Sequence, residues 1–327
     1  MRAGVLVLGP LLAKYRVAKV ALPGGCAIGS RPIDIHLNAL KKMGAKIKIR
    51  DGYVLASAKR GLKGCIIKFP KISVGATENL LIAACFAKGE TKLRNCALEP
   101  EIDDLIIFLK KIGCKIKRKG KRNINIYGID KLKSTTHKVV FDRIEVGTYM
   151  IAAALTKGHL KISNINPKII TTEINLLRRM GVNIKIKKKN ITVSRSERLK
   201  SVSVETKPYP GFPTDLQAQI MVLMILANGN STIKENIFEN RFMHVSELRR
   251  MGAEIEIRGN KAKILGKSRL NGAELMATDL RASVSLVLAG LISSSKTIVN
   301  RIYHLDRGYE KIEKKLSKCG AHIRRLK

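Results

Sequence analysis

The sequence predicts an α/β fold made of tandem units of about 70 residues, each with a buried helix and strands outside it. Three observations support this prediction. A phrase that reads Leu-Lys-Lys-Met-Gly-Ala in its first copy recurs five times, wholly apolar helices lie about midway between the copies, and short alternating strands follow. Helices inside and sheets outside would form inside-out α/β barrels.

Each copy of the phrase has the pattern of a helix C-terminus. Apolar residues fall on one face, cations crowd the last turn, and glycine takes the position just beyond it. A short strand is expected next, as at residues 45–49 and 253–257. The glycines of the five copies are Gly44, Gly113, Gly181, Gly252 and Gly320.

Between these copies the sequence predicts Ala-rich, apolar helices that include residues 80–84, 150–154, 217–220 and 284–288. A helix that is apolar all round belongs in a core. Residues 1–8 match this helix rather than the start of a unit, so we expect an N-terminally incomplete chain with its first repeat missing. Two domains are expected: an incomplete one at residues 1–139 and a second at 140–327.

The chain has 327 residues, and its 63 Lys and Arg against 25 Asp and Glu give a formal net charge of +38. Such a charge suggests nucleic acid as a partner. The cations are spread over almost every segment, however, without a dense basic arm, zinc-finger spacing or clustered aromatics. A Lys-biased surface is therefore favoured, and nucleic-acid binding or a basic cleft for an anionic small substrate remain alternatives.

Six cysteines show no paired CxxC spacing, and several lie inside apolar runs. This pattern favours reduced, buried thiols in a cytoplasmic protein over a disulfide framework. The apolar opening at residues 3–13 is too short to span a bilayer. No metal, nicotinamide or ATP motif is found, so we expect no cofactor.

Cys26 differs from the other cysteines in its surroundings. It follows Gly24-Gly25, which permits backbone angles that other residues resist, and precedes Arg31-Pro32. A nearby guanidinium stabilises a thiolate and makes a cysteine reactive. The segment is either a reactive loop or a structural turn that happens to contain a cysteine.

The segment Leu-Pro-Gly-Gly-Cys-Ala-Ile-Gly-Ser-Arg-Pro-Ile-Asp-Ile-His at residues 22–36 resembles the UDP-N-acetylglucosamine 1-carboxyvinyltransferases, a branch of the enolpyruvyl transferase family. Further matches follow in the family's order, at residues 71–77, 142–148, 212–219, 238–245, 276–283 and 301–310. The family has six units in two inside-out α/β barrels, of which five are visible here. Its opening segment, which carries a Lys-Asn pair, has no counterpart in this sequence.

The resemblance implies transfer of an enolpyruvyl group from phosphoenolpyruvate to the 3′-hydroxyl of UDP-N-acetylglucosamine, with release of phosphate, as the first committed step of peptidoglycan synthesis. It implies that Cys26 donates a proton to the enol carbon, is alkylated by fosfomycin and forms an adduct with phosphoenolpyruvate. It places Asp215 near the sugar hydroxyl and Arg307 at the phosphoenolpyruvate. Asp215 also opens a helix, so capping that helix is its alternative role.

The resemblance also implies a set of substrate-binding residues. Arg31 would contact phosphoenolpyruvate and Arg2 the diphosphate of the sugar, while Arg241, Asp279 and Arg281 would line the cleft or form helix-end ion pairs instead. The remaining contacts to the nucleotide sugar would be Pro32, Ile33, Asp34, Ile35, Lys71, Ile72, Ser73, Val74 and Ile237.

Two other functions stay open at this point. The chain would be a catalytically inactive, truncated homologue or gene fragment if the Lys-Asn segment is essential and missing. It would be a nucleic-acid-binding protein if net charge alone decided its partner. The related transferase that acts on shikimate 3-phosphate is less favoured, because the Gly-Gly-Cys loop belongs to the sugar-nucleotide branch.

Overall fold

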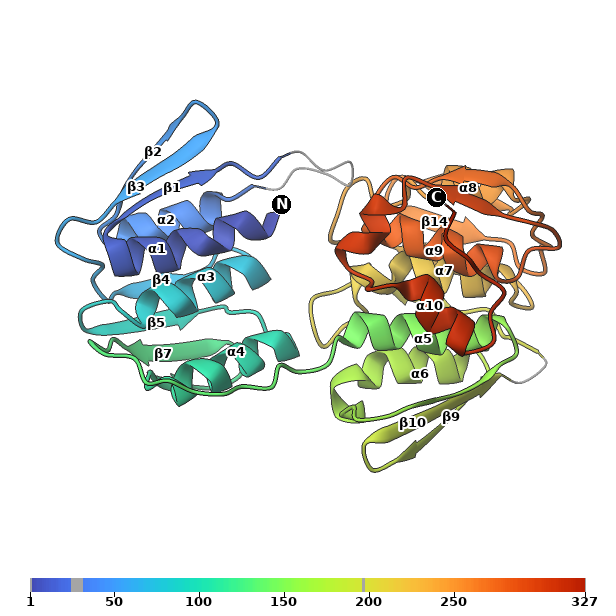
Figure 1. Ribbon diagram of the computed structural model, residues 1–327, viewed down its shortest axis with the longest axis horizontal. Coiled ribbons are helices and arrows are strands. Elements are labelled where there is room, and N and C mark those ends of the chain that lie inside the picture. The colour runs from blue at the N-terminus through green and yellow to red at the C-terminus, as the bar shows by residue number, and fades with distance from the viewer. Residues whose placement is uncertain (1, 25–31, 196–197, 327) are drawn as a thin grey trace. The chain divides into compact units, whose positions relative to one another are not determined.

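The computed structural model describes residues 2–24, 32–195 and 198–326, with two compact units that divide near residue 140 (Figure 1). Each unit has its own hydrophobic core. The apolar helices expected from the sequence lie in these cores. α7 (Gln217–Ile225) is buried at all nine positions, and α3 (Val74–Ala84), α5 (Arg143–Leu155) and α9 (Leu280–Gly290) are mostly buried.

Unit 1 packs helices against two sheets. One sheet has the antiparallel order β1-β3-β2, and the other has the order β4-β5-β7-β6, with β4 and β5 parallel. Besides α3, its elements are η1 (Arg2–Val7), α1 (Leu8–Tyr15), β1 (Val17–Ala21), α2 (Asp34–Lys42), β2 (Lys46–Arg50), β3 (Tyr53–Ser57), β4 (Ile66–Lys68), β5 (Glu90–Arg94), α4 (Pro100–Lys111), β6 (Lys115–Arg118) and β7 (Asn123–Tyr127).

Unit 2 arranges three sheets, of orders β8-β10-β9, β11-β12-β14-β13 and β15-β16, around the helices α5, α7 and α9. Its other elements are β8 (His159–Ile162), η2 (Pro167–Ile170), α6 (Thr171–Arg179), β9 (Val182–Lys187), β10 (Asn190–Arg195), β11 (Ser203–Glu205), η3 (Thr214–Leu216), β12 (Ser231–Lys234), α8 (Val245–Arg250), β13 (Ile255–Arg258), β14 (Lys261–Ile264), β15 (Glu274–Met276), β16 (Ile298–Asn300), η4 (Ile302–Arg307) and α10 (Ile312–Lys318). Helices inside and strands outside match the predicted inside-out arrangement.

The five repeated glycines all adopt positive φ, between +92° and +107°. Each follows the end of a helix: α2, α4, α6, α8 or α10. A left-handed residue there lets amides beyond the helix bond to its last carbonyls, as the amide of Gly44 does to Lys41 and that of Gly252 to Arg249. The expected strand follows the first four copies but not Gly320, where the described chain is irregular to residue 326.

Three of the cysteines, Cys85, Cys96 and Cys114, are buried free thiols, and Cys85 lies in an apolar run as expected. Burial raises the pKa of Cys96 to about 12, so this sulfur stays protonated at neutral pH. In the described parts of the chain, no helix combines the length and apolar character needed to cross a bilayer.

Candidate active site

Asp215 lies in the short 3-10 helix η3 at the entrance to α7. Gly147 of α5 makes room for the next residue, Leu216, because a Cβ at that glycine would lie 2.5 Å from Leu216 Cδ1. The Asp215 carboxylate does not cap α7. The N-cap residue of α7 is Leu216, and no side chain caps this helix. The Asp215 side chain keeps 40% exposure and is free to contact other elements.

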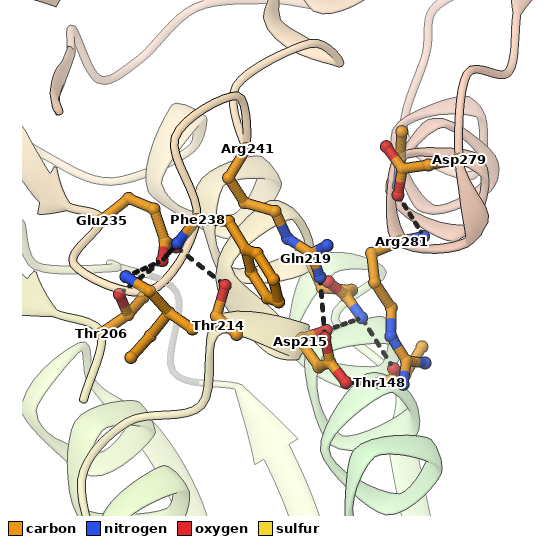
Figure 2. A network of polar contacts seen from close by, with 12 residues as sticks. Thr148, Thr206, Thr214, Asp215, Gln219, Glu235, Phe238, Arg241, Asp279 and Arg281 are labelled. Carbon is orange, nitrogen blue, oxygen red and sulfur yellow. Dashed lines mark hydrogen bonds and ion pairs between the residues drawn. The ribbon is translucent and has the colours of Figure 1, made fainter. Parts of the chain in front are cut away.

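Two guanidinium groups bind the carboxylate, one on each oxygen (Figure 2). Arg241 Nη2 lies 2.7 Å from Asp215 Oδ1, and Arg281 Nη2 lies 3.0 Å from Oδ2. Both arginine side chains are largely buried, at 5% and 14% exposure. The structure therefore brings together three of the predicted site residues, which come from three separate segments of unit 2.

This arrangement fixes the charge of Asp215. Burial alone would raise the pKa of the carboxyl, but Arg281 and then Arg241 outweigh it and hold the pKa at about 2. The carboxylate is therefore ionised at neutral pH. It is also a weak proton acceptor as long as both arginines contact it.

A buried polar cluster contacts both Arg281 and the backbone of Asp215. Tyr309 Oη lies 2.9 Å from Thr148 Oγ1 on α5 and accepts a hydrogen bond from Arg281 Nη1 at 3.2 Å. Gln219 Nε2 donates to the Asp215 backbone carbonyl at 2.9 Å. Tyr309 is only 1% exposed, so these contacts fix Arg281 and the backbone of Asp215 in one arrangement.

Asp279 has a different role from Asp215. It is the N-cap of α9, and its Oδ1 accepts hydrogen bonds from the amides of Arg281 and Ala282 at 2.9 and 3.2 Å. It thereby fixes the start of the helix that carries the Arg281 guanidinium. Nearby, burial lowers the pKa of His244 to about 4, so its imidazole is neutral at pH 7.

Two further predicted residues lie on neighbouring segments of unit 2. Ile237 is 38% exposed, and its amide donates to the carboxylate of Glu235 at 2.8 Å. Arg307 ends η4 with an exposed side chain that makes no hydrogen bond or ion pair within the described residues. A free, exposed guanidinium is available to an anionic ligand.

In unit 1 the structure brings together two predicted substrate-binding segments at the starts of α2 and α3. Pro32 and Ile33 precede α2, whose first residue Asp34 is exposed, while Ile35 is buried. Ser73 caps α3 by accepting from the Ala76 amide at 3.2 Å, and Val74 is its first residue. Lys71 and Ile72 directly precede this cap, and the Lys71 side chain is exposed.

The two helix starts are joined through His36 and Asn79. Asn79 Nδ2 lies 3.0 Å from His36 Nδ1 and donates to the Val5 carbonyl of η1 at 3.0 Å, while its Oδ1 accepts from the Gly9 amide. Gly75 packs beside the same imidazole, since a Cβ there would lie 3.4 Å from His36 Cε1. The backbone of Arg2 belongs to η1, but its side chain lies outside the described residues, as do Cys26 and Arg31 entirely.

The model of the EPSP synthase (3-phosphoshikimate 1-carboxyvinyltransferase) family matches residues 1–316 of this chain. The chain belongs to the EPSP synthase family. Within this family it is similar to the UDP-N-acetylglucosamine 1-carboxyvinyltransferase of Pelagibacter ubique (strain HTCC1062), with 63% identity over all of this chain and 78% of that protein. The protein of the same name from Rickettsia prowazekii (strain Madrid E) is 57% identical over the same shares.

Solved structures of an enolpyruvyl transferase and of an EPSP synthase show the same fold. The enolpyruvyl transferase NikO from Streptomyces tendae aligns with a TM-score of 0.88 and 27% identity over 98% of this chain and 76% of that one. EPSP synthase from Acinetobacter baumannii aligns with a TM-score of 0.72 at 21% identity, over 96% of this chain and 76% of that one. The predicted two-barrel enolpyruvyl transferase fold is thereby confirmed.

Sequence reasoning missed the residues that hold this family site in place. Gln219, Tyr309, Glu235 and Asn79 all lie in or beside stretches that match the family, but each contacts a partner at least 21 positions away in sequence. A polar residue inside an otherwise apolar helix, such as Gln219 in α7, was the available signal. No cluster of His, Cys, Asp or Glu among the described residues could hold a metal ion.

Proposed function

We propose that this protein transfers the enolpyruvyl group of phosphoenolpyruvate to the 3′-hydroxyl of UDP-N-acetylglucosamine and releases phosphate. The observation that carries this proposal is the 56–63% identity, over all of this chain, to relatives named for the carboxyvinyl transfer. The reaction would be the first committed step of peptidoglycan synthesis. The same identity does not favour the alternative of an inactive homologue.

The reaction runs by addition and then elimination. In the addition, the sugar oxygen bonds to C2 of phosphoenolpyruvate, Cys26 protonates C3, and the hydroxyl proton passes to Asp215. In the elimination, the bond from C2 to the phosphate oxygen breaks, and the departing phosphate takes up the proton held by Asp215. C3 returns a proton to the Cys26 thiolate, which restores the double bond and the thiol. Asp215 serves the first step because it is ionised and accessible.

The two arginines explain why substrate would bind before Asp215 accepts a proton. In the described structure they hold the pKa of Asp215 at about 2. An anionic substrate that binds to Arg241 and Arg281 reduces the positive potential at the carboxylate and raises its pKa. Asp215 then becomes a better proton acceptor only when substrate is present. Arg307 and Arg31 would hold the remaining charge of phosphoenolpyruvate.

We propose that the nucleotide sugar binds at the starts of α2 and α3 and at loop residues of unit 2. Arg2, residues 32–35 and residues 71–74 would bind it in unit 1, where the amides at the start of α3 suit phosphate. Ile237 and Asp279 would contact it in unit 2. Free thiols buried in apolar surroundings fit a reducing compartment, so we propose a cytoplasmic location.

The assay that tests the proposal measures phosphate release from phosphoenolpyruvate by the purified protein. Release is expected with UDP-N-acetylglucosamine and not with shikimate 3-phosphate. Release that depends on shikimate 3-phosphate instead would overturn the substrate assignment. Steep salt-dependent binding to random duplex DNA, without any response to the nucleotide sugar, would favour a nucleic-acid function.

Fosfomycin labelling tests the assignment of Cys26. We expect alkylation of Cys26 alone among the six cysteines, because burial raises the pKa of Cys65 and Cys96 and lowers their thiolate content. Cys319 is an exposed thiol and serves as the internal control. Peptide mass spectrometry that finds the label on Cys319 or Cys96 would contradict the assignment, and Cys26→Ser should abolish labelling and most turnover.

A further inference from the structure

Glu235 is a buried carboxylate next to the candidate active site, directly after β12, and only 2% exposed. Its two oxygens accept four hydrogen bonds (Figure 2). Oε1 accepts from Thr206 Oγ1 at 2.9 Å and from the amides of Ile237 and Phe238 at 2.8 and 3.2 Å. Oε2 accepts from Thr214 Oγ1 at 2.9 Å.

Two of these bonds come from the loop directly after Glu235, and the other two come from Thr206 and Thr214, 29 and 21 positions earlier in the sequence. Thr206 follows β11, and Thr214 is the first residue of η3, one position before Asp215. Ile237 and Phe238 begin the loop that leads to Arg241, whose guanidinium lies 5.4 Å from the centre of the Phe238 ring. Two hydrogen bonds join Glu235 to Asn260. The Glu235 amide donates to the Asn260 carbonyl at 2.8 Å, and Asn260 Nδ2 donates to the Glu235 carbonyl at 3.0 Å.

Glu235 is a buried acidic residue that forms no ion pair with any described side chain. Burying a carboxylate is costly unless hydrogen bonds compensate. Here four donors do so, and bonds to a charged acceptor are about twice as strong as neutral ones. A fully satisfied buried network of this kind selects one geometry for every segment it touches. If this position only had to fill space in the core, an apolar side chain would do so without the cost of burying a carboxylate.

We infer that Glu235 is a positioning residue for the reaction: through Thr214 it fixes where the Asp215 carboxylate lies relative to Arg241 and Arg281. Through the amides of Ile237 and Phe238 it also fixes the loop proposed to contact the nucleotide sugar. The catalytic part of this inference rests on the proposed function. The geometric part does not, because it concerns the placement of Asp215 in the free protein.

The sharpest test changes Thr214, because its hydroxyl alone reaches Oε2. Thr214→Val removes that bond with little change in shape, whereas Thr214→Ser keeps the hydroxyl. We expect Thr214→Val to lower kcat by about tenfold or more, since small misplacements of reacting groups cost that much, and Thr214→Ser to stay within about threefold of the wild type. Thr156→Val is the control for the same substitution away from the site, since it removes a hydroxyl bond to the Ala152 carbonyl at the end of α5.

A merely structural role gives a different result. Thr214→Val would then lower the melting temperature as Thr156→Val does, while the kcat of the folded protein would match the wild type. Equal kcat values for Thr214→Val, Thr214→Ser and the wild type would overturn the inference. If the wild-type protein shows no turnover at all, that result would instead count against the proposed function.

A second measurement does not need turnover. Carboxyl ¹³C NMR, with the Asp215 signal assigned from Asp215→Asn, follows the titration of Asp215 directly. In Thr214→Val we expect the midpoint to rise from the wild-type value toward that of an ordinary aspartate, and in Thr214→Ser to stay unchanged. An unchanged midpoint in Thr214→Val would contradict the geometric part of the inference, whatever the assay shows.

Discussion

The dipeptide Thr-Asp precedes two buried helices of unit 2 and serves a different purpose at each. Asp279 turns back onto α9 and accepts hydrogen bonds from two amides of its first turn. Asp215 makes no such bond to α7 and instead contacts Arg241 and Arg281. One aspartate stabilises its own helix, and the other is available for chemistry.

The preceding threonines explain part of this difference. Thr214 Oγ1 is bonded to Glu235, whereas Thr278 Oγ1 is buried without a hydrogen-bond partner among the described residues. The chain at Thr214 also continues as a 3-10 turn, so Leu216 and not Asp215 stands at the N-cap position of α7. Distant partners, rather than the dipeptide itself, decide the role of the aspartate.

The two sites are also linked. Arg281 offers its amide to Asp279 and its guanidinium to Asp215. The helix cap therefore positions a group that the candidate active site uses. The comparison predicts that changes at Asp215 act directly on turnover, whereas changes at Asp279 lower stability and affect turnover through Arg281 and the proposed sugar contact.

The largest expected effect comes from Asp215→Asn. It keeps the shape but removes the charge that accepts a proton, and general base catalysis typically contributes about 10²–10⁴-fold. We expect kcat for phosphate release to fall by about 100-fold or more. A kcat within threefold of the wild type would mean that Asp215 has no more catalytic importance than a cap.

The pH dependence of stability sharpens the comparison. The folded pKa of Asp215, about 2, lies below its ordinary value of 3.8, so its contribution to stability is present above about pH 4 and is lost as pH falls toward 2. The difference in denaturant midpoint between the wild type and Asp215→Asn should therefore shrink between pH 5 and pH 2. A difference that is constant over this range would contradict the ionised pair.

Asp279→Ala should lower the free energy of unfolding, because it removes the cap of α9. Loss of an N-cap typically costs about 1 kcal/mol, and Asn caps nearly as well as Asp. Urea unfolding should show this loss in Asp279→Ala and almost none in Asp279→Asn. The capping role would be wrong if Asn were as destabilising as Ala.

The smallest effect is expected from Thr278→Val. Because its buried hydroxyl has no partner among the described residues, replacing it with a methyl group should be neutral or slightly stabilising, within about 0.5 kcal/mol. The same substitution at Thr214 removes a bond to a carboxylate and should destabilise by more. Equal free energies of unfolding for the two variants would erase the difference between the two threonines.

Much of the fold could be predicted from local sequence, because its signals are local. The glycine of each repeat must adopt positive φ to end its helix, and the apolar helices must be buried wherever they lie. The strand expected after Gly320 was wrong. A short alternating segment pairs only if a neighbouring strand is in place, and residues 321–326 form none.

The site was predicted only in part. Asp215, Arg241 and Arg281 were named, but whether Asp215 caps its helix or binds the arginines depends on residues 26 and 66 positions away. Glu235 and Tyr309 were missed because their importance comes from contacts between segments, which no local pattern encodes. The predicted roles of Cys26 and Arg31 fall outside the described residues.

The most direct test of the central claim is the titration of the Asp215 carboxyl in the wild-type protein, followed by ¹³C NMR. If two guanidinium groups hold this carboxylate in solution, its midpoint will lie near pH 2. A midpoint at or above the ordinary value of 3.8 would show that the arginines do not bind it and that Asp215 is not set apart from Asp279 in the way described here.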